Sequence, residues 1–129
     1  MEEHKETFKP IQPPIRKNKN FVYEGKKYPI DFSLIKKYSN YFYNNRNNFK
    51  LIEDIELQPD NFKITDDSIH TFIACCQKEP FEITDSNIFS LYQLSVQYEV
   101  PELSNLTTEY IAKNNKSLVF QLISFKIQT

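Results

Sequence analysis

The chain has 129 residues, a size that folds as one domain and buries roughly 65 to 70 per cent of its unfolded surface. Its 11 Phe and 8 Tyr predict an aromatic core, while a net charge of −1 gives no global attraction to nucleic acid or an anionic membrane. The single glycine, Gly25, excludes glycine-rich phosphate loops and dinucleotide fingerprints, because both need several glycines where the backbone approaches phosphate.

No targeting or membrane-spanning pattern is found in the sequence. The N-terminal stretch MEEHKETFKP contains no apolar signal region, and the longest apolar-rich run, Leu118 to Ile127, is far too short to span a bilayer. Cys75 and Cys76 are adjacent and have no other cysteine to pair with, which indicates reduced thiols. We therefore expect a protein of the cytoplasm or nucleus without a membrane partner.

The first part of the chain is predicted to pass from a tail into a β-hairpin. Residues 1–18 are polar and proline-containing and show no apolar period, which predicts a disordered tail. The domain is expected over residues 19–113. It begins with two short strands, at Phe21–Tyr23 and Lys27–Ile30, because β-favouring residues flank a turn that contains Gly25.

The middle of the chain alternates helix and strand patterns. Apolar residues keep helical spacing from Asp31 to Asn45, with a break near Ser39, whose hydroxyl can cap a second short helix. After an asparagine-rich loop, alternation at Ile55–Leu57 predicts a third strand. A further helix is predicted to start at Asp66 or Asp67 and to end at Gln77. Its apolar stripe consists of Ile69, Phe72, Ile73 and Cys76.

The strongest pattern, over residues 81–112, predicts a brief strand-like link followed by two helices that form a hairpin. Thr84 and Asp85 are expected to open the first helix, and Pro101 to end it and begin the second. Apolar residues cover most of the circumference of the first helix, which indicates burial on several sides. Residues 114–129 are predicted to be a C-terminal helix, docked on the hairpin or leading to a further domain.

The order of these elements resembles the BTB/POZ domain. Phe21 to Phe42 looks like the opening of that family, with a β-hairpin and a helix that ends in a Ser-x-x-Phe step. Ile69 to Phe81 is similar to its third helix, and Asn87 to Ile111 to its fourth and fifth helices with an apolar-Pro corner. The match covers about residues 20 to 113. It also looks like the divergent BTB-like domains that precede ankyrin repeats in some protists.

The resemblance implies an α+β fold with a small three-stranded sheet flanked by helical hairpins and followed by the C-terminal helix. Three departures from the family affect dimerisation. Asp31 stands where many members have His, and Asn18 stands nearest to the buried acidic residue of zinc-finger members. The long N-terminal strand that some members exchange between subunits is not expected in the proline-containing tail. We therefore do not expect the charged dimer pocket of those members.

The function implied by the resemblance is a non-catalytic protein–protein interaction module that self-associates, serves as an adaptor, or does both, with no cofactor. The first helix carries more apolar residues than one small sheet is expected to cover, and the family uses this region for dimers. The candidate dimer interface is Phe32, Leu34, Ile35 and Tyr38.

A second candidate site lies between the second helix and the third strand. BTB adaptors that recruit a cullin ubiquitin-ligase scaffold carry an apolar-x-Glu triplet in this connection, and Leu51-Ile52-Glu53 looks like it. The candidate partner-binding residues are Phe49, Leu51 and Glu53. The competing interpretation is a plain loop that leads into a strand. A Skp-like or elongin-like ligase subunit is the alternative function within the same fold.

A small thiol-dependent enzyme is the alternative from another class. Cys76 faces the apolar stripe, where burial raises the pKa of the thiol and suppresses its reactivity. The spacing of His70, Cys75 and Cys76 is not that of a usual zinc site. Helix-dipole effects and loop solvation explain the acidic pairs Asp66-Asp67 and Glu53-Asp54 without acid–base chemistry. We therefore expect no catalytic, metal-binding or cofactor-binding residue.

Overall fold

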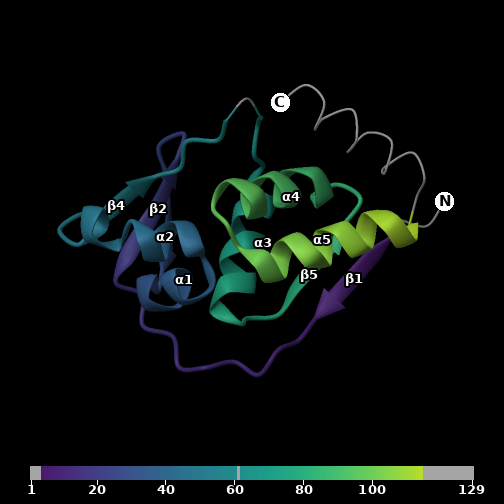
Figure 1. Cartoon of the computed structure of the whole chain (residues 1–129), viewed down its shortest axis with the longest axis horizontal. Coiled ribbons are helices and arrows are strands. Elements are labelled where there is room, and N and C mark those ends of the chain that lie inside the picture. The colour runs from purple at the N-terminus through teal and green to yellow at the C-terminus, as the bar shows by residue number, and fades with distance from the viewer. Residues whose placement is uncertain (1–3, 61, 115–129) are drawn as a thin grey trace.

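The computed structural model describes residues 4–60 and 62–114, and Figure 1 shows how they fold. The elements in chain order are β1 (Lys5–Phe8), β2 (Lys19–Tyr23), β3 (Lys26–Ile30), α1 (Phe32–Tyr38), α2 (Asn40–Asn44), the 3₁₀ helix η1 (Arg46–Phe49), β4 (Asp54–Glu56), α3 (Asp66–Gln77), β5 (Phe81–Thr84), α4 (Ile88–Gln97) and α5 (Pro101–Asn114). The predicted α+β fold class is confirmed.

The main sheet has three strands in the order β3-β2-β4, with β2 antiparallel to β3 and parallel to β4. The hairpin turn between β2 and β3 places Glu24 at φ 50° and Gly25 at φ 80°. Two successive residues with positive φ match the right-handed twist of the flanking strands, and this explains why the single glycine of the chain lies here. In the view of Figure 1, the sheet lies on the left beside α1 and α2.

Ser39 divides the first helical segment as predicted. Its backbone is extended at φ −112° and ψ 115°, so α1 ends there and α2 begins after it. The Ser39 hydroxyl accepts a hydrogen bond from the Phe42 N–H at 3.1 Å and donates one to the Tyr98 carbonyl at 2.5 Å. The same hydroxyl therefore caps α2 and attaches it to the end of α4.

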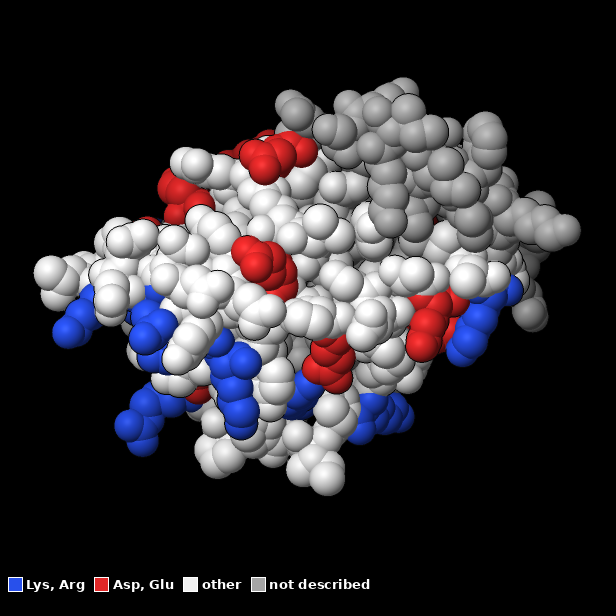
Figure 2. Space-filling model, viewed as in Figure 1, with Lys and Arg blue, Asp and Glu red and all other residues white. Residues whose placement is uncertain are grey.

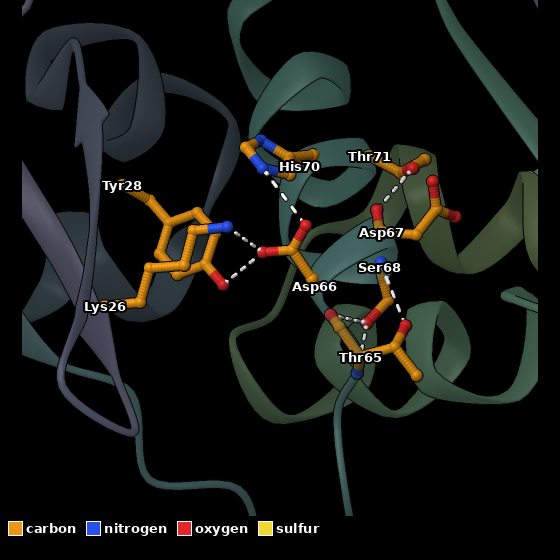
Figure 3. Close-up of polar contacts among 8 residues, drawn as sticks. All are labelled: Lys26, Tyr28, Thr65, Asp66, Asp67, Ser68, His70 and Thr71. Atoms are coloured by element: carbon orange, nitrogen blue, oxygen red, sulfur yellow. Dashed lines mark hydrogen bonds and ion pairs between the residues drawn. The ribbon is translucent and has the colours of Figure 1, made fainter.

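The helix α3 packs against α1, α4 and β5 and forms the centre of the fold. It begins with a capping box in which the Thr65 and Ser68 side chains satisfy each other's backbone N–H groups. Its predicted apolar stripe is confirmed, because all four of its residues are buried. At the first turn, Asp66 accepts hydrogen bonds from the Tyr28 hydroxyl at 2.7 Å and from Lys26 Nζ at 2.5 Å, so α3 is joined to β3 (Figure 3).

The helices α4 and α5 form the predicted hairpin, with Val100 and Pro101 at its corner. The predicted cap of α4 is wrong, because the helix begins at Ile88 and its N-cap residue is Asn87. Asp85 instead accepts a hydrogen bond from the Tyr110 hydroxyl of α5 at 2.6 Å. The Asp85 carboxylate therefore connects the segment just before α4 to α5, a contact that local capping rules do not predict.

Residues 5–8 correct the prediction of a disordered tail. They form β1, which pairs antiparallel with β5 so that Phe8 lies opposite Phe81. The two rings stack with centroids 4.8 Å apart. Glu6 and Phe8 are half-buried and alternate with exposed Lys5 and Thr7. Four residues, most of them polar, are too few for this alternation to be recognised as a strand pattern in the sequence.

The predicted domain, residues 19–113, begins at the first residue of β2 and ends one residue before the end of α5. Residues 9–18 connect β1 to β2, and α5 extends through Asn114. The predicted C-terminal helix over residues 114–129 lies, apart from Asn114, outside the described residues. Within residues 4–60 and 62–114, no helix has the length and apolar character needed to cross a membrane.

Candidate functional site

The predicted partner-binding residues lie at the end of η1 and in the connection from η1 to β4, and they differ in exposure. Phe49 is half-buried, with its ring centroid 6.0 Å from that of Phe32 and 5.5 Å from that of Phe42. Leu51 is 96% exposed, and Glu53 is also exposed. Phe49 therefore fixes the connection to the core, while Leu51 and Glu53 face solvent.

Backbone and side-chain contacts hold this turn in place. The Ile52 N–H donates a hydrogen bond to the Phe49 carbonyl at 3.1 Å, and the Lys19 ammonium donates one to the Ile52 carbonyl at 2.6 Å. Lys19 also lies 5.6 Å from the centre of the Phe32 ring. We name residues 49–53 the Leu51 turn. Because the turn is already ordered, a partner that binds Leu51 spends little free energy on ordering it.

A pocket of about 600 Å³ lies beside the Leu51 turn and brings together residues from α2, β4 and the end of α4. It is lined by Tyr41, Phe42, Phe49, Ile52, Asp54, Ile55, Glu56, Gln58, Asp60, Gln97 and Tyr98. Phe42 and Ile55 are fully or almost fully buried, whereas Ile52 is 42% exposed. The site therefore combines a buried apolar floor with a polar and acidic rim.

The polar groups at the rim are fixed by contacts between the segment that follows β4 and the end of α4. The Gln58 N–H donates a hydrogen bond to the Tyr98 hydroxyl at 3.0 Å, and burial raises the pKa of Tyr98 to about 12. Gln97 donates to the Gln58 carbonyl at 2.6 Å and accepts from the Asp60 N–H at 3.0 Å. Sequence reasoning did not identify Tyr41, Gln97 or Tyr98 as site residues, because helical spacing indicates burial and not which elements meet.

One acidic residue of the rim is already paired. The Lys27 ammonium lies 2.9 Å from the Asp54 carboxylate. Its hydrogen bond is the largest cause that lowers the pKa of Asp54, and the hydrogen bond from Asn20 is the next.

On the face shown in Figure 2, Lys and Arg side chains lie mainly toward the lower left and are interrupted by neutral surface, with acidic groups scattered over the rest. This face carries no continuous basic field of the kind that binds nucleic acid.

The predicted dimer interface is wrong for two of its four residues. Phe32 is 5% exposed and Ile35 is 0% exposed, because α2, η1 and α3 cover the face of α1 that the sheet leaves open. Leu34 and Tyr38 are half-buried and remain candidates. The ammonium groups of Lys37 and Lys78 lie 5.5 Å and 4.2 Å from the centre of the Tyr38 ring.

Asn18 and Asp31, the residues at the departures from the family pattern, make contacts within the subunit. Asp31 is buried and accepts hydrogen bonds from the backbone N–H groups of Arg16 at 2.8 Å and Ser33 at 3.0 Å. The Asn18 side-chain oxygen accepts one from the Phe32 N–H at 3.0 Å. Both side chains thereby bind backbone donors at the start of α1.

The two thiols are in surroundings that suppress nucleophilic chemistry. Burial raises the pKa of Cys75 to about 12 and that of Cys76 well above its ordinary value. Neither thiol has the thiolate population that catalysis at neutral pH requires. His70 faces Asp66, with 3.5 Å between Nε2 and the carboxylate (Figure 3). In the part of the chain that the structure describes, no group of three His, Cys, Asp or Glu side chains is placed to hold a metal ion.

No protein-family model matches the sequence, and no curated protein matches it. Among solved structures, the chain is similar to the BTB (Tramtrack and Bric a brac) domain of human gigaxonin. The TM-score is 0.60, the sequence identity is 16%, and the match covers 72% of this chain and 75% of that chain. The chain has a BTB-like fold.

The BTB-like fold agrees with the resemblance predicted from the order of the elements. At this level of identity, the similarity concerns the fold alone. It lends no support to the predicted association with ankyrin repeats. The Leu51 turn and the adjoining pocket combine exposed apolar groups with an ordered backbone.

Proposed function

We propose that this protein is a non-catalytic protein-interaction module whose Leu51 turn binds a cullin-type ubiquitin-ligase scaffold. The observation that carries the proposal is the 96% exposure of Leu51 on a turn that internal contacts hold in place. An isolated exposed leucine is ordinary on a protein surface. Leu51 is followed by the partly exposed Ile52 and lies beside an apolar-floored pocket, so a partner can cover several apolar groups at once.

Glu53 completes the proposed contact. It is exposed and directly precedes β4, and its carbonyl accepts a hydrogen bond from the Asn20 N–H at 2.9 Å. The backbone at Glu53 is thus fixed while its exposed carboxylate can meet a polar or cationic group of a scaffold. Leucine supplies apolar contact area, and a carboxylate at a wet rim contributes mainly to specificity and association rate.

The experiment is a binding titration of the purified domain against the N-terminal half of a cullin, by calorimetry. Binding that Leu51→Ala weakens while the melting temperature stays unchanged supports the proposal. A parent domain that does not bind any cullin tested removes the adaptor function. Binding that requires an F-box or SOCS-box type partner in addition favours the Skp-like or elongin-like alternative.

Self-association is a second candidate, favoured by the way β1 is attached. Among the described residues, β5 is the one strand that pairs with β1, and the two form a two-stranded sheet. Residues 9–18 run along the lower border of the molecule in Figure 1 between β1 and the main sheet. A β1 that pairs with β5 of a second copy makes the same contacts as it makes within one chain. Leu34 and Tyr38 of α1 supply the remaining half-buried apolar contacts of the proposed dimer.

Light scattering on the purified protein tests self-association. A dimer at tens of micromolar that Phe8→Ala converts to monomer supports exchange of β1, because this variant removes the ring that stacks on Phe81. A dimer that is unaffected by Phe8→Ala but disrupted by Leu34→Glu supports the α1 contact instead. A monomer at all concentrations removes the homodimer.

A further inference from the structure

The outer edge of β4 presents backbone hydrogen-bonding groups to solvent. β4 is the last strand of the main sheet, and its inner side bonds to β2: the Asn20 N–H donates to the Glu53 carbonyl, and the Leu57 N–H donates to the Val22 carbonyl, both at 2.9 Å. In a strand, successive residues direct their backbone groups to opposite sides. Asp54 and Glu56 therefore direct their N–H and C=O groups away from β2.

This outer edge is unpaired in the described part of the chain. The only strand partner of β4 among residues 4–60 and 62–114 is β2, and no hydrogen bond within that part reaches the backbone of Asp54 or Glu56 from outside the sheet. Both residues line the pocket of about 600 Å³ described above. A strand added at this edge would therefore run along the pocket, and alternate side chains of that strand would face it.

The pocket offers apolar surface where such a side chain would enter. Aromatic rings of Tyr41, Phe49 and Tyr98 line it together with Ile52, above the buried floor. The rings belong to α2, η1 and the end of α4, and ring contacts hold them in place: the Tyr41 and Phe42 centroids are 5.0 Å apart, and those of Phe42 and Tyr98 are 5.2 Å apart. An aliphatic side chain of the occupant therefore finds a preformed apolar site.

The charges around the edge select the occupant. Glu53, Glu56 and Asp60 are exposed, and within the described part of the chain no cation lies within ion-pair distance of their carboxylates. A short, acidic edge strand resists pairing with an identical edge, because like charges face each other across the new ladder. The same charges attract an extended segment that carries Lys or Arg on either side of its apolar residue.

We propose that the outer edge of β4 binds an extended, basic segment of a partner protein by strand addition, with one aliphatic side chain of that segment in the adjoining pocket. Backbone hydrogen bonds to Asp54 and Glu56 supply affinity, while the pocket and the acidic rim supply specificity. This binding goes beyond the proposed scaffold contact, because it uses the backbone of β4 and does not use Leu51. A scaffold on the Leu51 turn and a peptide on β4 are neighbours that share Phe49, Ile52, Glu53 and the adjoining pocket.

The test uses the whole chain and a synthetic peptide, with Lys or Arg at positions flanking a central Leu and Thr elsewhere. Fluorescence anisotropy measures its affinity, and NMR amide shifts locate its site. We expect the amides of Asp54 and Glu56 to show the largest shifts. Two altered peptides serve as controls on the unmodified protein: one carries Glu in place of each basic residue, and the other carries N-methyl groups on alternate backbone nitrogens. Each is expected to bind about tenfold more weakly or worse.

Protein variants give a second arm. Glu56→Lys is expected to weaken the basic peptide about tenfold, while Glu109→Lys, the same charge change on the exposed face of α5, leaves binding within about twofold. Leu51→Ala is also expected to leave peptide binding within about twofold, so the result stands apart from the cullin titration. Equal binding of the N-methylated peptide, shifts elsewhere, or no binding would overturn the proposal. Concentration-dependent shifts of β4 without peptide would show that a second copy occupies the edge instead.

Discussion

The hydroxyl of Ser39 donates a hydrogen bond of 2.5 Å to the backbone carbonyl of Tyr98. The contact joins residues far apart in the sequence, at the place where the α1–α2 pair meets the α4–α5 hairpin. Ser39 is 1% exposed, so the bond is shielded from solvent. Tyr98 also stacks on Phe42 and lines the pocket, so this bond helps to hold one wall of the candidate site.

Ser39→Ala is therefore expected to destabilise the domain by about 1–3 kcal/mol, because it removes the cap of α2 and leaves a buried carbonyl without its donor. Urea titration measures the change. Ser33→Ala, on the exposed side of α1, is the matched control and is expected to stay within about 0.5 kcal/mol. Equal behaviour of the two variants would contradict the structural role of Ser39.

Leu94→Ala and Phe72→Ala are each expected to destabilise the fold by about 2–5 kcal/mol, because both side chains are 0% exposed in the core between α3 and α4. Denaturant titration decides this as well. Val96→Ala, at a position of α4 that is 51% exposed, is expected to change the free energy of unfolding by less than about 0.5 kcal/mol. A loss of that small size at Leu94 would mean that the buried face of α4 is misassigned.

Leu51→Ala is expected to lose about 1–3 kcal/mol of binding to a cullin scaffold, with no change in melting temperature, because its side chain touches little of the fold. Glu53→Ala is expected to cost less and to act mainly on the association rate. Surface plasmon resonance measures the association and dissociation rates separately. If Leu51→Ala lowers the melting temperature, the residue supports the fold and the adaptor interpretation loses its anchor.

The stability of the domain is expected to fall on acidification partly through Asp66. Hydrogen bonds from Lys26, the larger cause, and from Tyr28, the next, lower the pKa of Asp66 below its ordinary value of 3.8. A carboxyl group with a lowered folded-state pKa stabilises the fold above the unfolded pKa, and this contribution disappears as the pH falls through the folded pKa. Unfolding titrations from neutral pH to below about pH 4 should therefore show a shallower acid slope for Asp66→Asn.

Lys26→Met is the companion variant for this prediction. It removes the largest cause of the pKa shift and keeps the carboxyl group, so it is expected to reduce the acid slope in the same direction. The side chains of both partners are 55% exposed, so added salt should also weaken the effect. Unchanged acid slopes in both variants would show that the contact in Figure 3 does not contribute to stability.

The thiols are expected to resist labelling by a disulfide reagent at neutral pH in the folded state and to react once the domain is unfolded. Burial raises the pKa of Cys75 to about 12 and shields both sulfur atoms. Absorbance of the released thiol follows the reaction. Rapid labelling of a single cysteine in the folded protein would reopen the thiol-dependent enzyme as an alternative.

Local sequence patterns predicted most elements, because helices and hairpins depend on contacts between neighbours in the chain. The break at Ser39 and the stripe on α3 are of this kind. β1 was missed because its pairing with β5 depends on a partner far along the chain and not on its own polar residues. Phe32 and Ile35 were assigned to a dimer interface because the sequence does not show that α2, η1 and α3 cover them.

The candidate site was predictable only in part, because it too depends on contacts between residues far apart in the chain. Leu51 and Glu53 lie two residues apart in a recognisable motif, so the sequence indicated them. The pocket is assembled from Tyr41, Phe49 and Tyr98, which lie on three different elements. Their spacing in the chain shows that they favour burial, but the three-dimensional arrangement decides which of them meet beside β4.

The pairing of β1 with β5 fixes where the N-terminal strand lies relative to β4. The Tyr110 hydroxyl contacts the His4 carbonyl at 2.7 Å, so the beginning of the described chain lies against the helix that completes it. In Figure 1, β1 lies at the opposite end of the long axis from β4. A tag, fluorophore or surface tether placed ahead of Lys5 would therefore leave the Leu51 turn pointing into free solution, which makes the N-terminus the attachment point for immobilised binding measurements.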